Sequence, residues 1–174
     1  SNIKQEVSFF KKEWLLDVSR QALGMTHRYT EMFRLCATDY EWVPGSPIIT
    51  EYVNELKDEY SKKELDIIYK DLEERYSVKI IRCEIIKLKK LSEVYKHTDG
   101  GPLLHYSRRV HIPLITNSDV TFTVMDNTIH MLEGHGYEIN NQLPHAVNNN
   151  SNYDRIHMII DVLPDDMLNY GIER

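Results

Sequence analysis

Two histidines and one aspartate in this chain have the residue types and spacing of metal ligands. In His97-Thr98-Asp99 an imidazole and a carboxylate stand two residues apart, and on an extended segment such residues project to the same side. His145 is the leading candidate for a third ligand. Two neutral imidazoles and one carboxylate on one face of an octahedron suit Fe(II) and leave three positions open. Alone, however, the tripeptide is weak evidence, because a turn aspartate beside a histidine is commonly structural.

An arginine downstream supports the metal-site hypothesis. Arg155 follows His145 by ten residues. If 2-oxoglutarate chelates the iron, its distal carboxylate needs a fixed cation, and a guanidinium offers two parallel N–H donors. The alternative is structural: Arg155 could be a buried arginine paired with Asp154 or Asp161.

These candidates lie in the half of the chain that favours strands. From Ser77 onward the hydrophobic pattern has a period of two, and turn-forming residues separate runs rich in Val, Ile and Thr. The expected strands cover residues 78–88, 107–115, 120–125 and 155–162.

The first part of the chain has a helical pattern instead, and residues 5–75 are expected to be mainly helix. One stripe carries Phe10, Trp14, Leu15 and Val18, with Gly24 at a C-terminal cap. A second helix should start at the capping box 61–64, and its apolar stripe consists of Leu65, Ile68, Tyr69, Leu72 and Tyr76. Residues 48–60 are expected to form a short helix between them.

Together these patterns predict a mainly β protein with N-terminal helices: a double-stranded β-helix (a cupin-like jelly roll) with helices packed on one face. We expect a single domain over residues 1–174. Its parts would be a helical portion (1–76), the β-helix core (77–164) and a C-terminal tail (165–174).

Two of the expected strands have unusual polar faces. Arg109 and His111 alternate with apolar residues in one strand, and Arg155, His157 and Asp161 do so in another. In an ordinary sandwich such polar faces point to solvent. If the apolar faces instead pack on the helices, the arginines and histidines line a polar cavity.

Composition narrows the possible partners and location. The 174 residues carry a formal net charge of −6, which argues against nucleic acid as a partner, since phosphate binding needs a basic face. No apolar run approaches the ~20 residues that cross a bilayer, so no membrane partner is expected. The two cysteines, Cys36 and Cys83, cannot form a disulfide framework, and we expect a cytoplasmic protein.

Five short motifs in register resemble the aspartyl/asparaginyl β-hydroxylase family of Fe(II)/2-oxoglutarate-dependent dioxygenases. The resemblance covers roughly residues 78–164, and the motifs are His97–Gly101, Arg109–Leu114, Gly134–Asn141, Pro144–Asn149 and Arg155–Asp161. It implies Fe(II) bound by His97 and His145 and 2-oxoglutarate held by Arg155. It also implies that Arg109 and His111 line the cavity for co-substrate and substrate.

The chain departs from the animal members of this family at two positions. Those enzymes have Gly where this chain has Asp99, so the complete set of two histidines and a carboxylate is available here, as in the bacterial members. A carboxylate ligand favours hydroxylation over halogenation, which needs a vacant metal position. Ile86 stands where the animal enzymes have a Ser that helps to hold 2-oxoglutarate, so another donor must serve.

The resemblance therefore implies an enzyme that uses Fe(II), 2-oxoglutarate and O2 to hydroxylate an amino acid, with release of succinate and CO2. The substrate could be a small molecule or a peptide, and its carboxylate could pair with Arg109 or Arg108. The alternative is a non-catalytic jelly roll that binds or senses a small anion in the same cavity. Nothing in the sequence predicts the oligomeric state.

Overall fold

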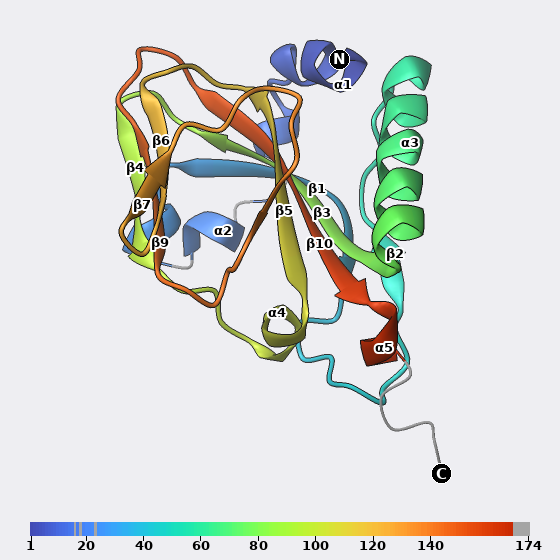
Figure 1. Cartoon of the computed structure of the whole chain (residues 1–174). Coiled ribbons are helices and arrows are strands. Elements are labelled where there is room, and N and C mark those ends of the chain that lie inside the picture. Colours follow the sequence, from blue (N-terminus) through green and yellow to red (C-terminus); the bar gives the residue numbers. More distant parts are fainter. Residues whose placement is uncertain (16, 18, 23, 169–174) are drawn as a thin grey trace.

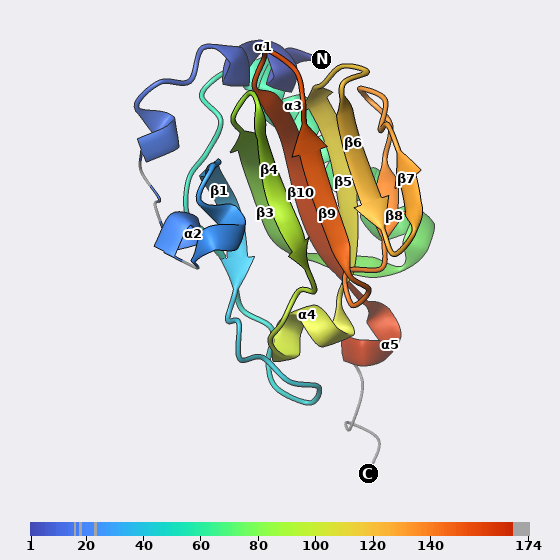
Figure 2. The same ribbon diagram turned by 90° about the vertical axis from the view of Figure 1, so that its left-hand side faces the viewer.

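Two antiparallel sheets face each other and enclose the interior of the protein (Figures 1 and 2). The computed structural model describes residues 1–15, 17, 19–22 and 24–168. The six-stranded sheet has the order β2 (Thr50–Tyr52), β1 (Thr30–Thr38), β3 (Val78–Leu88), β10 (Arg155–Pro164), β5 (Arg108–Ile115), β8 (Tyr137–Ile139). The four-stranded sheet has the order β4 (Ser92–His97), β9 (His145–Asn149), β6 (Val120–Val124), β7 (Asn127–Ile129). This is the predicted double-stranded β-helix.

Helices cover the outer face of the larger sheet (Figure 1). The first is α1 (Asn2–Ser8), and the longest is α3 (Glu59–Tyr76). Shorter helical segments lie elsewhere: η1 (Glu13–Leu15), α2 (Ser19–Ala22), η2 (Met25–His27), α4 (Pro102–Tyr106) and α5 (Asp165–Leu168). No helix among the described residues has the length and apolar character needed to cross a membrane.

The predicted start of the long helix was wrong by a few residues. Asp58 is the N-cap, and its carboxylate accepts a hydrogen bond from the Ser61 amide at 2.8 Å. Ser61 is therefore inside the first turn and is not the first residue of a capping box. The predicted stripe does pack on the sheet through Leu65, Ile68, Tyr69 and Leu72, whereas Tyr76 is exposed.

The expectation that residues 5–75 are mainly helical was wrong. This part supplies β1 and β2, and residues 50–52 pair with β1 where a short helix was expected. A register shift between Arg34 and Cys36 breaks the two-residue period of β1, so its apolar residues mimic a helical spacing. The helix expected around Phe10 is replaced by α1 and η1, and Val18 lies outside the described residues.

Gly24 does not cap a long helix. Its φ of +91° places it in a region that suits glycine, and it precedes η2. Of the expected C-terminal tail, residues 165–168 form α5, and residues 169–174 lie outside the described part of the chain.

The two faces of the larger sheet are chemically different, as one of the two sequence interpretations proposed. Ile156, Met158, Ile160 and Val162 of β10 belong to the hydrophobic core that also contains residues of α1 and α3. The opposite face of the same strand carries Arg155, His157 and Asp161, all buried. Because the apolar face packs on the helices, the charged face points into the space between the sheets, where the candidate site lies.

Candidate metal centre and its charged surroundings

The two candidate histidines face each other across neighbouring strands. His97 ends β4, His145 begins β9, and the strand register pairs them directly. Residues opposite each other in an antiparallel pair have Cβ atoms about 5 Å apart. Accordingly, the centres of the two rings are 4.4 Å apart, and Phe122 of β6 stacks on His145 with a centroid distance of 6.0 Å.

Backbone carbonyls orient both rings in the same way. The Nδ1 atoms of His97 and His145 lie 2.7 Å and 2.9 Å from the carbonyl oxygens of Tyr95 and Leu143. A carbonyl oxygen can only accept, so each Nδ1 must carry the proton. Nε2 is then the ring nitrogen left to bind a metal, and such an Nδ1–H···O=C bond is typical of metal-binding histidines.

The Asp99 carboxylate completes the group. Its Oδ1 lies 3.7 Å from His97 Nε2, and its Oδ2 lies 3.8 Å from His145 Nε2. One ligand atom from each of the three residues lies within 4.8 Å of the others. Adjacent ligands on a metal with bond lengths of about 2.1 Å are about 3 Å apart, so the three ligand atoms would need to move closer together by up to about 2 Å on binding. The donor types and their spacing therefore fit a divalent transition metal.

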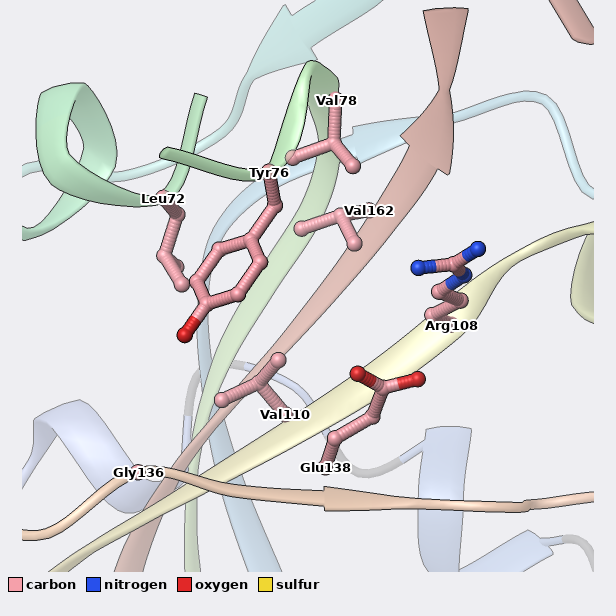
Figure 3. Close-up of a pocket in the computed structure, with 8 residues that line it drawn as sticks. All are labelled: Leu72, Tyr76, Val78, Arg108, Val110, Gly136, Glu138 and Val162. Atoms are coloured by element: carbon pink, nitrogen blue, oxygen red, sulfur yellow. The ribbon is translucent and has the colours of Figure 1, made fainter. Parts of the chain in front are cut away.

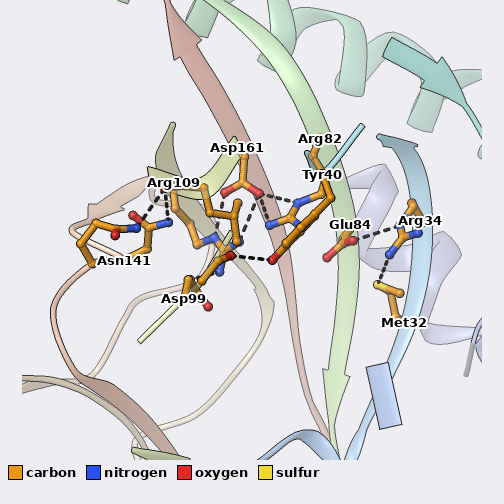
Figure 4. Close-up of polar contacts among 12 residues, drawn as sticks. Met32, Arg34, Tyr40, Arg82, Glu84, Asp99, Arg109, Asn141 and Asp161 are labelled. Atoms are coloured by element: carbon orange, nitrogen blue, oxygen red, sulfur yellow. Dashed lines mark hydrogen bonds and ion pairs between the residues drawn. The ribbon is translucent and has the colours of Figure 1, made fainter. Parts of the chain in front are cut away.

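Asp99 is the first member of a row of ion-paired residues that continues through Arg109 and Asp161 to Arg82 (Figure 4). Arg109 forms an ion pair with Asp99 through Nη1, and its Nε donates to Asp161 at 2.8 Å. Arg82 donates to the other oxygen of Asp161 at 2.5 Å. Burial acts to raise the pKa of Asp161, but Arg109 and Arg82 outweigh it and bring the pKa to about 2.

A second buried cluster lies on the same face of β10. Arg155 Nη2 donates to His157 Nδ1 at 2.6 Å, and since a guanidinium can only donate, the proton of neutral His157 is on Nε2. Burial, together with the charge of Arg155, lowers the pKa of both His157 and His111 well below the usual value. Both rings are therefore neutral at pH 7.

These neutral histidines present buried polar atoms that are not satisfied within the protein. Among the described residues, neither ring nitrogen of His111 has a hydrogen-bond partner, and the same holds for Nε2 of His157. Buried polar atoms are nearly always hydrogen-bonded, so such orphans indicate a place for a ligand. A narrow cavity of about 30 Å³ is lined by His97, His145, Arg109, His111 and Arg155, together with apolar residues.

The structure separates the alternatives that the sequence left open for Asp99, Arg155 and Arg108. The carboxylate of Asp99 contacts Arg109 and the histidines, which is not the contact with following amides expected of a structural turn residue. Arg155 contacts His157, whereas Asp161 pairs with Arg109 and Arg82.

Arg108 does not face the cavity. It is exposed and lines a pocket of about 90 Å³ on the outer side of the sheet, together with Glu138 and Leu72 (Figure 3). Successive residues of a strand point to opposite faces, so Arg108 does not point into the cavity that Arg109 lines. Of the two arginines considered for the substrate carboxylate, Arg108 was therefore wrong.

Several site residues were not singled out from the sequence. Arg82 belongs to none of the motifs found in the sequence, and Arg34 and His27 lie in the part that was expected to be helical. His27 packs its ring edge-on against His97 with a centroid distance of 4.9 Å. His157 was visible as a polar residue on the face of Arg155 and as part of the motif Arg155–Asp161, but neither signal gave it a role.

A sequence model of one family, described as aspartyl/asparaginyl beta-hydroxylase, matches residues 52–164, well over half of the chain. Among curated proteins, no sequence matches the chain.

A solved structure supports the fold. An oxidoreductase of the 2OG-Fe(II) oxygenase family from Burkholderia pseudomallei superposes with a TM-score of 0.55 at 15% identity. The superposition covers 77% of this chain and 66% of that one, so this chain spans just under two thirds of the Burkholderia structure. A predicted oxalate decarboxylase from Thermotoga maritima superposes with a TM-score of 0.42 at 12% identity, over 77% of this chain and 80% of that one. A cupin domain from Bordetella pertussis superposes with a TM-score of 0.38 at 14% identity, over 48% of this chain and 82% of that one.

Proposed function

The chain belongs to the aspartyl/asparaginyl β-hydroxylase family, and on that premise we propose that it hydroxylates an amino acid, free or within a peptide. The reaction would use Fe(II), 2-oxoglutarate and O2 and release succinate and CO2. The observation that carries the proposal is the convergence of His97, Asp99 and His145 beside a buried arginine. Two imidazoles and a carboxylate are the donor set of non-haem Fe(II) oxygenases.

His97 and His145 would bind the iron through Nε2, and Asp99 would supply a negative charge. With 2-oxoglutarate bound, the iron supplies the activation of O2 that no amino-acid side chain can provide. The protein's own contribution is orientation: the Tyr95 and Leu143 carbonyls hold the rings, and Arg109 holds the carboxylate.

Arg155 would bind the distal carboxylate of 2-oxoglutarate. It is 3% exposed, so it can bind a carboxylate away from water, where the pairing of charges is strong. The proton of His157 on Nε2 makes this residue a candidate for the second donor. His157 stands opposite Ile86 in the strand register, so it offers an N–H group beside the position where the animal relatives have a serine.

The remaining walls of the cavity would exclude water from a bound metal. Phe122, Val147, Ile86 and Ile159 line the cavity around the candidate ligands. Because the cavity measures only about 30 Å³, 2-oxoglutarate can enter only if surrounding side chains move.

An anaerobic titration tests the proposal. Fe(II) and then 2-oxoglutarate are added to the metal-free protein while binding stoichiometry and the weak visible charge-transfer absorption of the iron chelate are recorded. We expect one iron and one 2-oxoglutarate per chain, followed by succinate formation on admission of O2. His145→Ala serves as the control that should lose all three signals. Failure of the wild-type protein to bind both would refute the proposal, whereas binding without any succinate would support the non-catalytic alternative.

A further inference from the structure

A second and larger cavity adjoins the candidate metal centre. It has a volume of about 470 Å³, within the range of about 300–1,000 Å³ typical of small-molecule sites. Asp99 and Arg109 line one side of it, and Arg34, Arg82 and Glu84 line the side formed by β1 and β3. A molecule in this cavity would therefore lie next to one of the three candidate ligands.

The register of β1 and β3 makes this wall charged. Arg34 pairs with Glu84 in the register, and its Nε donates to Glu84 Oε1 at 3.0 Å. Arg82 lies two residues before Glu84, so both side chains point to the same face of β3. Figure 4 shows Arg82, Glu84 and Arg34 in sequence along this face.

Two of these three charged side chains are buried, which carries an energetic cost. The side chain of Glu84 is 3% exposed, and that of Arg82 is 10% exposed. Removing ionised groups from water carries a penalty that hydrophobic residues of similar size would avoid. A guanidinium has five N–H groups and a carboxylate can accept about four hydrogen bonds, so side chains of these two types can bind polar groups of a ligand as well as groups of the protein.

Charges of both signs meet in this region. The guanidinium groups of Arg34, Arg82 and Arg109 pair with four carboxylates, those of Asp17, Glu84, Asp99 and Asp161. A ligand with one positive and one negative group can place each of them against its opposite on the wall, so that neither is buried without a partner.

We propose that this cavity binds the substrate as a free, zwitterionic amino acid, with its carboxylate at Arg82 and its ammonium group at Glu84. This inference rests on the proposed function, and it selects the free amino acid over the peptide. A residue within a peptide has amides in place of both charges. A site that is built to bind charged groups rejects an analogue without them, because its own buried groups then remain unmatched.

Part of the cavity lining lies outside the residues matched by the family. Arg34 and Tyr40 both lie before residue 52. The Tyr40 hydroxyl donates to the Gly100 carbonyl at 3.0 Å, and its ring lies 5.7 Å from the Arg82 guanidinium. The loop after β1 is thereby attached to the segment that follows Asp99, which fixes the cavity relative to the metal centre.

Calorimetric binding measurements test the inference. The common L-amino acids are titrated singly into the protein loaded anaerobically with Fe(II) and 2-oxoglutarate, and into the metal-free protein. Each is compared with its N-acetyl and C-amide derivatives. We expect at least one free amino acid to bind and both derivatives to bind at least about tenfold more weakly.

Matched variants locate the binding. Glu84→Gln should weaken amino-acid binding by at least about tenfold while the affinities for Fe(II) and 2-oxoglutarate stay unchanged. Glu31→Gln is the control, since Glu31 is also on β1–β3 and ion-paired, with Lys87 and Lys89, but does not line the cavity. If Glu84→Gln does not fold, Ala37→Leu, which fills the same cavity, should abolish amino-acid binding instead.

The outcomes separate this inference from the proposed function. If the protein binds Fe(II) and 2-oxoglutarate but no free amino acid, or binds the blocked derivatives as tightly, the cavity assignment is overturned and the proposed function stands. If an amino acid binds with the expected dependence on Glu84 although Fe(II) and 2-oxoglutarate do not, the cavity assignment stands and the proposed function fails.

Discussion

Replacing Asp161 with asparagine should destabilise the metal-free protein in a way that depends on pH. Asp161 is fully buried and paired with Arg109 and Arg82, so Asp161→Asn removes a counter-charge from two buried guanidinium groups, of which Arg109 keeps its ion pair with Asp99. Removing one partner of a buried ion pair typically costs about 3–5 kcal/mol. We expect a loss of this size at pH 7.

The pH dependence follows from the lowered pKa. The pKa of Asp161 is about 2 in the folded protein against an ordinary value of 3.8. A carboxyl whose pKa is lowered by folding stabilises the protein above the unfolded pKa, and this stability is lost as the pH falls through the folded pKa. The shift corresponds to about 2.4 kcal/mol in total, of which about 1 kcal/mol is lost between pH 6 and pH 3.

Urea unfolding of both proteins at pH 6 and pH 3 measures this effect. Groups common to both proteins cancel in the difference, so the stability advantage of the wild type should shrink by about 1 kcal/mol at pH 3. Asp71→Asn is the control, because Asp71 pairs with Arg75 on the exposed surface of α3 and its loss should cost less than about 1 kcal/mol. The reasoning would be refuted if the wild type exceeded the Asp161→Asn variant in unfolding free energy by the same amount at pH 6 and at pH 3. Should that variant not fold, Arg82→Gln tests the same point, since it should raise the pKa of Asp161 while Arg109 remains.

Four further outcomes are expected. His97→Ala and His145→Ala should each lose stoichiometric Fe(II) binding with the fold retained, as metal analysis and circular dichroism would show; full iron content in both would exclude them as ligands. Asp99→Ala should bind Fe(II) more weakly but not lose it, because the two imidazoles remain; unchanged iron affinity with a lower melting temperature of the metal-free protein would make Asp99 purely structural. Arg155→Ala should lower 2-oxoglutarate affinity by a factor of hundreds, corresponding to about 3–5 kcal/mol, and affect Fe(II) affinity far less; unchanged 2-oxoglutarate affinity would move the role to Arg109. His157→Phe should weaken 2-oxoglutarate binding but not Fe(II) binding in the same titrations, and equal loss of both would indicate a structural role.

Local sequence determined the strands whose pattern is regular. β3, β5, β6 and β10 were predicted within a residue or two at most of their ends, because β-branched residues and a two-residue period are properties of consecutive residues. The same alternation placed Arg155 and His157 on one face and the apolar residues of β10 on the other. The motif around His97 and the spacing from His145 to Arg155 were equally visible.

Tertiary structure alone decided which charged groups meet. β1 was missed because its bulge disrupts the local period, and with it the cavity wall that contains Arg34 was missed. Nothing local relates Arg82 to Asp161, which are paired in the register of β3 and β10. Such partners depend on strand pairing between distant segments, which the backbone hydrogen bonds of the whole sheet determine. The sequence by itself therefore indicated the metal-binding chemistry, whereas the folded chain determined that Arg109 contacts Asp99 and that the neighbouring cavity carries both signs of charge.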